Sequence, residues 1–524
     1  MHKASSESDP RYEASDSVLS DPTDLGVGIA RPDLPSARRS PIGTILKGIG
    51  GRAALMLVNM LVLLVTSRVM APAEFGRFAI ALLSVDLAAA ASHAFVGIPL
   101  LQRHRLRSKD YRNAFTLLLI VGLVSGALLF ASANLIETWL DMSGLALLLR
   151  AAALIIPLRC LASFFIAVLQ RQAKVEQIIL SQVRSQMIAG LGVTLIFALL
   201  GFGAWSLLMG LAVATGLELG WCMKAAKIRL RLTLTRESVQ LLADGVAPLA
   251  NRMLIFASDS IDRLAIGASF GASPLGIYTR ASNLVLIPTN LVGLPAQAAL
   301  LSWFSRIKGD KGRISDALGY AIAFQGLALI PMAVALWLAS PLLVHLLLGS
   351  QWSAAVPLAQ VLFVGAFARL GTTPFESAAL AAGYAWSAAR RQFVSTAILF
   401  AGLIVAVGHS VAWVAIAVAL SRVVYYVLGL RFAIVTFKRS WPTVVAAHAK
   451  SVAVTLVGLG AAFALSSVVH FASPSANDLV LVTGYLLASG MLLLLGPKWL
   501  VAPVGPSAAG FIAKLGRGLV ARLA

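Results

Sequence analysis

The chain has 524 residues, of which 59% are hydrophobic and only 12% are charged. Soluble globular proteins carry about 25% charged and roughly 45–50% apolar residues, so this composition excludes an ordinary soluble enzyme, a disordered protein and a coiled coil. The mean hydropathy is +0.85, and apolar stretches of about twenty residues recur along the chain. The sequence therefore predicts an all-α integral membrane protein. Cys160 and Cys222 lie inside apolar stretches, which argues against a disulfide framework.

Residues 1–44 are polar and predict a disordered cytoplasmic tail. Fourteen transmembrane helices follow, with approximate cores at 49–69, 75–98, 113–135, 145–169, 177–200, 204–223, 239–268, 275–303, 318–348, 354–383, 392–408, 411–435, 451–471 and 479–497. We divide them into an N-terminal lobe of six (45–236), a C-terminal lobe of six (237–440) and two further helices (441–500). Residues 501–524 form a second cytoplasmic tail with a weakly amphipathic stretch.

Basic residues gather on one side of the predicted membrane. With fourteen spans, 31 of the 43 Lys and Arg residues fall in the two tails or in connections after even-numbered helices. Connections after odd-numbered helices, such as 136–144, 201–203 and 269–274, contain none. This pattern predicts that both termini are cytoplasmic. The net charge of +21 is spread over short loops, which argues against nucleic-acid binding.

Short sequence echoes recur at an offset of about 200 residues. They are APAEFGRF (71–78) with GASPLGIY (271–278), GIP (97–99) with GLP (293–295), and Ala204-Trp205 with Ala412-Trp413. The offset equals six predicted spans, so the two halves would have the same orientation. In transporters built from such parallel repeats, the substrate path lies between the halves.

Several arginines lie where the predicted spans should be apolar. They are Arg159, Arg252, Arg280 and Arg369, with Arg68 near the end of the first span. Each would cost about 2.5–3.5 kcal/mol if it faced lipid at the bilayer centre. They must therefore face one another or a water-filled cavity between the halves. Because guanidinium is a planar, permanently charged fork suited to phosphate, we predict that these residues bind an anionic ligand such as a diphosphate, with Arg280 and Arg369 as the first candidates.

Acidic residues in the spans allow two interpretations. Buried carboxyl groups could bind a coupling proton or Na⁺; the candidates are Asp86, Asp259, Asp262, Glu218 and Glu376, the first two above the others. Acids could instead neutralise the arginines, in the pairs Asp262 with Arg263 or Arg280, Asp86 with Arg52 or Arg68, and Glu376 with Arg369. The sequence leaves both interpretations open.

No motif of a catalytic or metal site is present in the sequence. It has no Walker loop, no pair of Cys or His at metal-ligand spacing and no nucleophile elbow. The predicted outward loops are only a few residues long and leave no room for a catalytic domain. We therefore expect neither an enzyme nor a metal site, and no cofactor beyond a coupling H⁺ or Na⁺.

Three motifs resemble those of the polysaccharide transporter family, the Wzx-type oligosaccharide flippases. They are SRVMAPAEFG (67–76), DRLAIG (262–267) followed by GASPLGIYTRA (271–281), and LLGSQW (347–352). The resemblance covers roughly 45–500. It implies a place in the MOP superfamily, which includes the MATE antiporters and the lipid II flippase MurJ, with two six-helix lobes around a central cavity and alternating access. Arg280 falls where such flippases often carry a cavity arginine.

The resemblance also implies a function. The expected protein is a flippase of a bacterial inner membrane that moves a polyprenyl-diphosphate-linked oligosaccharide, the repeat unit of an exopolysaccharide or surface glycan, to the periplasmic leaflet. Its expected partners are this substrate, membrane lipids and glycan polymerase or export machinery. The alternatives left open are a MATE-like drug or cation antiporter, a membrane glycan polymerase or ligase, and a non-transporting scaffold. A surplus of buried arginine over acid counts against the antiporter, and the short outward loops against the polymerase.

Overall fold

A computed structural model of the chain describes residues 41–103, 107–228, 232–235, 237–307, 310–437, 441–469 and 473–495. The predicted tails, except for 41–44, lie outside the described residues. Helices make up nearly all of the described part, which contains no strand. The prediction of an all-α fold is therefore confirmed.

The first half of the chain forms helices that follow the predicted spans. They are α1 (Pro41–Val69), α2 (Pro72–Ser92), a π-helical segment (His93–Gly97) with α3 (Ile98–Gln102), α4 (Ser108–Leu140), α5 (Leu145–Arg171), α6 (Val175–Gln186), a π-helical segment (Met187–Thr194) with α7 (Leu195–Leu199), and α8 (Ala204–Ala226). The Pro and Gly residues between them supply boundaries: Pro72 begins α2, and Gly144 takes a left-handed conformation (φ 80°) immediately before α5.

The second half forms the remaining helices. They are α9 (Glu237–Phe270), α10 (Ala272–Arg306), α11 (Lys311–Leu343) with a π-helical segment (Val344–Leu348) and a 3₁₀ turn (Ser350–Trp352), α12 (Ala355–Gly371), α13 (Thr373–Ala381), α14 (Ala385–Ala406), α15 (Val411–Phe437), α16 (Trp441–Val468) and α17 (Pro474–Leu495). Arg390 and Arg391 fall between the predicted spans 354–383 and 392–408, but both lie inside α14. Arg391 is buried with its guanidinium over the ring of Phe432.

Each predicted span coincides with a helix, but twelve helices of the described part are long and apolar enough to cross a membrane. The two predicted spans outside this set are α1, whose apolar part Ala54–Val69 is shorter, and α9. α9 carries five charged residues between positions 244 and 263, which lower its hydropathy. The count of fourteen therefore stays a prediction, while a multi-pass membrane protein is confirmed.

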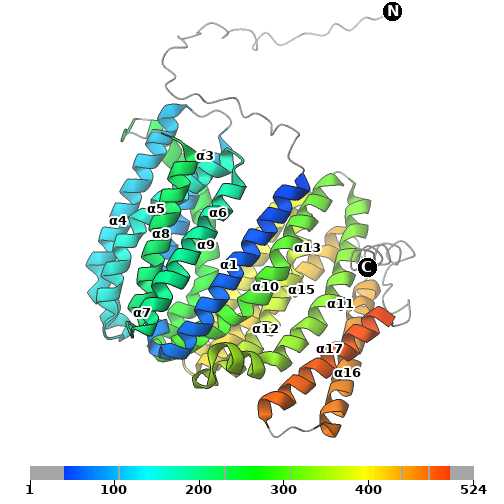
Figure 1. Ribbon diagram of the computed structural model, residues 1–524. Coiled ribbons are helices and arrows are strands. Elements are labelled where there is room, and N and C mark those ends of the chain that lie inside the picture. The colour runs from blue at the N-terminus through cyan, green and yellow to red at the C-terminus, as the bar shows by residue number, and fades with distance from the viewer. Residues whose placement is uncertain are drawn as a thin grey trace, which may run out of the picture.

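The helices form two bundles that meet along α9 and α10 (Figure 1). In the first bundle α5 packs against α2, α4 and α8, and α1 against α6; in the second α12 packs against α10, α11 and α15. α9 contacts α2 and α4 as well as α10 and α15, so it belongs to the surface of both bundles. α16 and α17 pack against each other and against α11. The position of α9 explains why this helix carries polar groups that the outer helices lack.

The two bundles are joined where α2 and α10 begin. A Cβ atom on Gly76 would lie 1.8 Å from the Ala272 carbonyl oxygen, and one on Gly276 would lie 1.9 Å from the Pro72 carbonyl oxygen. The contact is reciprocal, and the two glycines are the ones shared by the 200-residue echo. Only glycine lets the two backbones approach so closely.

A second contact at the same end fastens α1 to the segment after α11. The Trp352 Nε1 atom donates to the Ser67 carbonyl oxygen at 2.7 Å, and the Gln351 side chain donates to the same oxygen. The Trp352 ring is fully buried and meets the Phe75 ring edge-on, with centroids 5.4 Å apart. A continuous hydrophobic core surrounds this junction and draws residues from both bundles. This end of the molecule is therefore closed.

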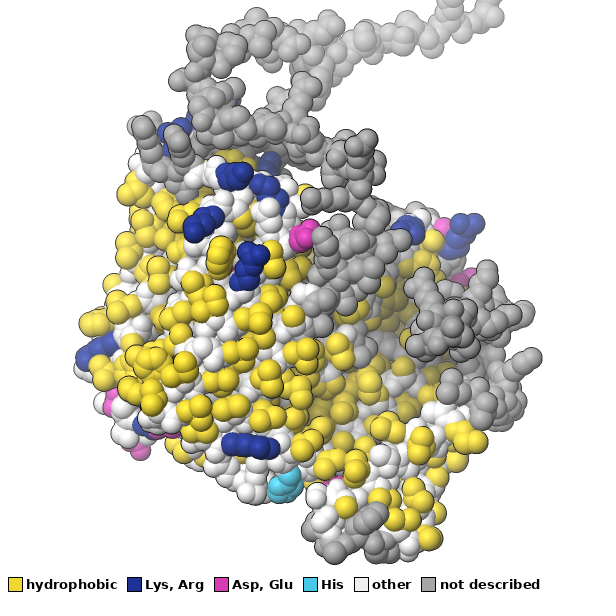
Figure 2. Space-filling model, in the orientation of Figure 1, with side chains coloured by type: hydrophobic (Ala, Val, Ile, Leu, Met, Phe, Trp, Pro, Cys, Tyr) yellow, Lys and Arg dark blue, Asp and Glu magenta, His cyan; other side chains and the backbone are white. Residues whose placement is uncertain are grey.

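The lateral surface is largely apolar (Figure 2). Hydrophobic side chains cover most of the visible face, and most of the visible Lys and Arg side chains lie toward the end that carries α3 and the start of α1. This is the distribution expected of a protein whose sides face acyl chains. The assignment of the basic end to the cytoplasm stays a prediction from the sequence.

We predict that Gly276→Ala destabilises the protein, because the added methyl group would overlap the Pro72 carbonyl oxygen. Overpacking of this kind costs about 1–3 kcal/mol. The measurement is the midpoint of thermal unfolding in detergent. Gly216→Ala in α8 is the matched control, since a Cβ atom there meets nothing within 4 Å, and it should leave the midpoint unchanged or raise it. Equal behaviour of the two variants would contradict the close approach of α2 and α10.

Candidate functional site

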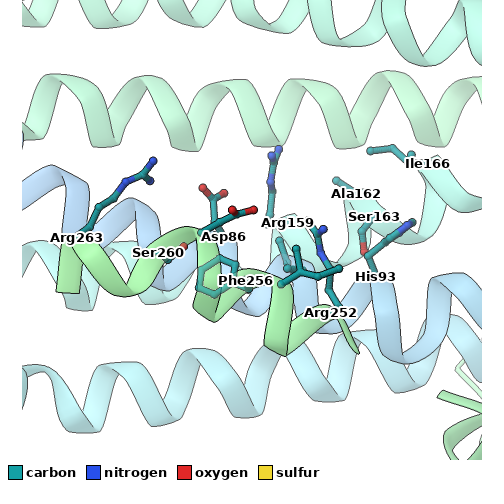
Figure 3. Close-up of a pocket in the computed structure, with 14 residues that line it drawn as sticks. Asp86, His93, Arg159, Ala162, Ser163, Ile166, Arg252, Phe256, Ser260 and Arg263 are labelled. Atoms are coloured by element: carbon teal, nitrogen blue, oxygen red, sulfur yellow. The ribbon is translucent and has the colours of Figure 1, made fainter. Parts of the chain in front are cut away.

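A first cavity of about 440 Å³ lies between α2, α5 and α9 (Figure 3). Its charged lining residues are Asp86 on α2, Arg159 on α5, and Arg252, Asp259 and Arg263 on α9. In Figure 3, Asp86 lies between Arg263 on one side and Arg159 and Arg252 on the other. Arginines that the sequence places in two different spans therefore line the same cavity.

Arg159 forms an ion pair with Glu218, a carboxylate of α8. Its Nη1 atom lies 3.0 Å from Oε2 of Glu218, and the other oxygen of Glu218 accepts from Gln182 on α6 at 3.2 Å. The Glu218 side chain is only 8% exposed, whereas Arg159 is 34% exposed. The ion pair thus fixes the arginine at the cavity wall and leaves the rest of its guanidinium accessible.

Three further charged groups of this cavity have no ion-pair partner in the described part of the chain. Asp86 is half-buried, and its strongest charged neighbours are Arg159 and Arg263. Arg252 is exposed to the cavity. The Nε atom of Arg263 is buried without a hydrogen-bond acceptor among the described residues. The first cavity therefore offers unsatisfied donors on two arginines, which an anion could fill.

A second cavity of about 520 Å³ adjoins the first, because Asp259 and Arg263 line both. Helices α9, α10, α12, α13, α14 and α15 form its walls. Asp259 accepts hydrogen bonds from Arg369 Nη1 and from Arg422 Nη2, both at 2.9 Å. Two guanidiniums thus share one carboxylate. The two cavities together are lined by five arginines and four acids.

The other two acids of the second cavity are bonded to tyrosines. The Tyr278 hydroxyl donates to Asp262 at 2.5 Å, and the Tyr425 hydroxyl donates to Glu376 at 2.7 Å. Uncharged polar side chains complete the wall; they are Ser282, Thr289, Asn290, Gln297, Thr372, Thr373 and Gln392. Such amides and hydroxyls can donate and accept hydrogen bonds. The second cavity is therefore suited to a ligand rich in hydroxyl groups.

Two of the predicted phosphate ligands lie away from both cavities. Arg280 on α10 is buried, with its Cζ atom 3.4 Å from the centroid of the Phe75 ring and its Nη2 atom 3.2 Å from Thr66 Oγ1. Arg68 is exposed near the closed end and donates to the Leu346 carbonyl oxygen at 2.9 Å. Arg280 therefore fills the junction between the bundles in this conformation.

The internal pairs expected from the sequence differ from those observed. Asp262 accepts from Tyr278 and from the backbone N–H of Arg263, rather than from an arginine side chain. Arg369 pairs with Asp259, rather than with Glu376. Asp86 is not paired with Arg68, and the side chain of Arg52 lies outside those described. The sequence shows which charged residues lie in the spans, but which of them form pairs depends on the helix faces that meet.

Sequence reasoning did not select Arg263 or Arg422 as site residues. Arg263 follows Asp262 directly and was considered only as its partner, although it lies four residues after Asp259 and so on the same helix face. Arg422 lies inside the predicted span 411–435. Their depth in apolar stretches was the signal that could have identified both.

The chain is similar in sequence to proteins of polysaccharide biosynthesis. A family model described as "Polysaccharide biosynthesis protein" matches residues 65–357, more than half of the chain. The succinoglycan biosynthesis transport protein ExoT of Rhizobium meliloti is 27% identical over 56% of this chain and 59% of its own length. The lipopolysaccharide biosynthesis protein WzxC of Escherichia coli is 23% identical over 66% of this chain and 70% of its own.

The teichuronic acid biosynthesis protein TuaB of Bacillus subtilis is 24% identical over 55% of this chain and 60% of its own length. The match thus spans about three fifths of the curated relatives ExoT and TuaB. ExoT is named a transport protein, which agrees with the expectation that this chain is not an enzyme.

Two solved structures share the fold. The lipid II flippase MurJ in an inward closed conformation superposes with a TM-score of 0.66 at 14% identity, covering 86% of this chain and 99% of MurJ. An inward-facing MATE transporter of the MOP superfamily gives 0.59 at 13% identity, covering 73% of this chain and 94% of the other. At sequence identities this low, the likeness shows a shared fold and does not show a shared function. The predicted MATE/MurJ-like fold is confirmed.

We predict that Asp259→Asn lowers the stability of the protein, because it leaves Arg369 and Arg422 without their shared carboxylate. Hydrogen bonds to charged groups contribute about 1.5–3 kcal/mol each, so we expect a loss of about 2 kcal/mol. Thermal unfolding of the purified protein measures it. Asp141→Asn, at an exposed left-handed position that Asn also adopts, is the control. If Asp259→Asn unfolds at the same midpoint as the wild type, the ion pairs of Asp259 are contradicted.

Proposed function

This chain belongs to the polysaccharide biosynthesis protein family, and from that premise we propose that it is a flippase for lipid-linked oligosaccharides. It moves a polyprenyl-diphosphate-linked repeat unit of an exopolysaccharide or surface glycan from the cytoplasmic to the periplasmic leaflet of a bacterial inner membrane. The first and second cavities together form one polar chamber within the membrane-spanning helices. The observation that carries the proposal is the cluster of guanidiniums around this chamber. The names of the relatives, which refer to succinoglycan and lipopolysaccharide, support the same substrate class.

The first cavity holds the diphosphate in this proposal. Arg252 and Arg263 lack ion-pair partners among the described residues, and Arg159 uses only part of its guanidinium on Glu218. The three guanidinium groups can donate several charge-assisted hydrogen bonds to phosphate oxygens. Arg369, the other cavity arginine expected from the sequence, already shares Asp259 with Arg422. The binding role therefore shifts from Arg280 and Arg369 toward the arginines of α5 and α9.

The second cavity holds the sugar residues next to the diphosphate. Its wall of amides and hydroxyls includes Asn290, Gln297 and Gln392, which can bond sugar hydroxyls without imposing charge. Tyr425 adds an aromatic surface of the kind that sugar rings contact. The polyprenyl tail stays in the lipid phase, since a hydrocarbon chain gains nothing from a polar chamber.

The contacts between the bundles support alternating access as the mechanism of this transport. In this conformation the Gly76–Gly276 contact and the bonds from Trp352 and Gln351 to Ser67 close the end that the positive-inside pattern assigns to the periplasm. Release to that side requires these contacts to separate. Arg280 would leave the Phe75 ring in the same step.

Asp86 is the residue we propose for energy coupling. Among the five acids considered from the sequence, Asp259 and Glu218 are held in ion pairs, and Asp262 and Glu376 accept from tyrosines. Asp86 has no such partner in the described part and faces the chamber. A proton suits it better than Na⁺, because hard cations need several oxygen ligands and nearby arginines repel them.

The substrate-binding role predicts that the Arg252→Ala/Arg263→Ala variant loses at least about tenfold in glycan export, since it removes two charge-assisted contacts. Export would be measured at equal membrane levels in cells lacking the native gene. The matched control is Arg313→Ala, which removes a 77%-exposed arginine paired with Asp310. Lys at both positions should restore part of the activity. Full export by the double alanine variant would refute the binding site.

The coupling role predicts that Asp86→Asn transports independently of a proton gradient, because the amide cannot gain or lose the proton. The rate would be compared with and without an imposed pH difference in proteoliposomes. Asp141→Asn, outside the chamber, should keep the wild-type response to the gradient. An unchanged response in Asp86→Asn would exclude this carboxylate as the coupling group.

A further inference from the structure

A cationic cluster lies on the outer side of the first bundle, apart from the chamber. The Arg184 Cζ atom on α6 is 5.5 Å from the centroid of the Trp221 ring on α8, and the Lys224 Nζ atom is 5.4 Å from the same centroid. Both distances are within the range of cation–π contacts. The Trp221 indole N–H is buried without an acceptor among the described residues, so packing and the two cations hold the ring.

The cluster sits among side chains that face lipid. Leu180 on α6, Met187 and Ile188 in the π-helical segment that follows it, and Met223 on α8 are close to the cluster in sequence and are 43–50% exposed. Trp221 lies five residues before the end of α8, roughly 7 Å at 1.5 Å per residue. This is the depth at which a long basic side chain reaches toward lipid headgroups.

Neither cation forms an ion pair with a carboxylate in the part of the chain that the structure describes. Glu218, one turn before Trp221 on α8, is already bonded to Arg159 and Gln182. Lys227, at the end of α8, is exposed and adds a third positive charge. Cations that share one ring repel each other, and an anion between them would remove that repulsion. Headgroup phosphates are the anions present at this depth of a membrane.

We propose that Arg184 and Lys224, arranged around Trp221, bind the phosphate of an anionic phospholipid whose acyl chains lie along α6 and α8. The exposed apolar residues beside the cluster provide the surface for the chains, and the two cations select the charged headgroup. This lipid site is separate from the chamber, because none of Arg184, Trp221 and Lys224 lines either cavity. It does not rest on the proposed transport activity.

The test uses the full chain, delipidated in detergent and titrated with dioleoylphosphatidylglycerol while thermal unfolding is followed. Each cation near a charged leaflet contributes about 1 kcal/mol, so Arg184→Gln/Lys224→Gln should lower the apparent affinity about thirtyfold. Arg150→Gln is the matched control, since Arg150 lies 5.6 Å from the Phe130 ring in a similar cation–π contact elsewhere on the bundle. It should bind the lipid as the wild type does, and so should Arg184→Lys.

Two further titrations distinguish the phosphate of an anionic phospholipid from other sources of phosphate. Dioleoylphosphatidylcholine should stabilise the wild type more weakly, because its headgroup has no net charge, and inorganic phosphate should not stabilise it. Wild-type affinity in the double variant, or equal stabilisation by inorganic phosphate, would overturn the proposal. Should the double variant fail to fold, Lys224→Gln alone, at an exposed position, is expected to lower the affinity about fivefold; no loss there would overturn the proposal as well.

Discussion

A guanidinium stays charged at bilayer depth, and its charge must be met by protein, water or ligand. Much of the architecture follows from this constraint. α9 packs between the two bundles and brings Arg252, Asp259 and Arg263 to the walls of adjoining cavities. α5, α12 and α15 contribute their arginines to the same chamber, and the outer helices present apolar side chains to lipid. The charges that are costly for insertion thereby become the groups available for binding.

The arginines of the two cavities differ in whether a carboxylate neutralises them. Arg369 and Arg422 are neutralised in part by Asp259, which ties α9 to α12 and α15. Arg252 and Arg263 are left without an ion pair among the described residues and can respond to a ligand. The close backbone contact at Gly76 and Gly276 holds one end shut. The arginines proposed to bind lie on α5 and α9, whereas the glycines of the closed end lie on α2 and α10.

The fold was largely predictable because hydropathy and basic loops mark spans directly, and every predicted core falls on a helix. The site was predictable in part. Depth in an apolar stretch identified Arg159, Arg252 and Arg369, which line the cavities. It could not show that Arg280 stacks on Phe75, since this depends on which face of α10 meets α2. The hydrogen bond between Tyr278 and Asp262 likewise depends on how α9 packs against α10. The packing of neighbouring helices cannot be deduced from a single sequence.

The most direct test of the arginine chamber is transbilayer movement of a fluorescent polyprenyl-linked saccharide in proteoliposomes. The diphosphate-linked and monophosphate-linked forms of the same saccharide would be compared at equal concentration. The account predicts that the diphosphate form moves at least about tenfold faster, because it makes more charge-assisted contacts with the guanidiniums. Equal rates for the two forms, or no movement of the diphosphate form above protein-free liposomes, would contradict it.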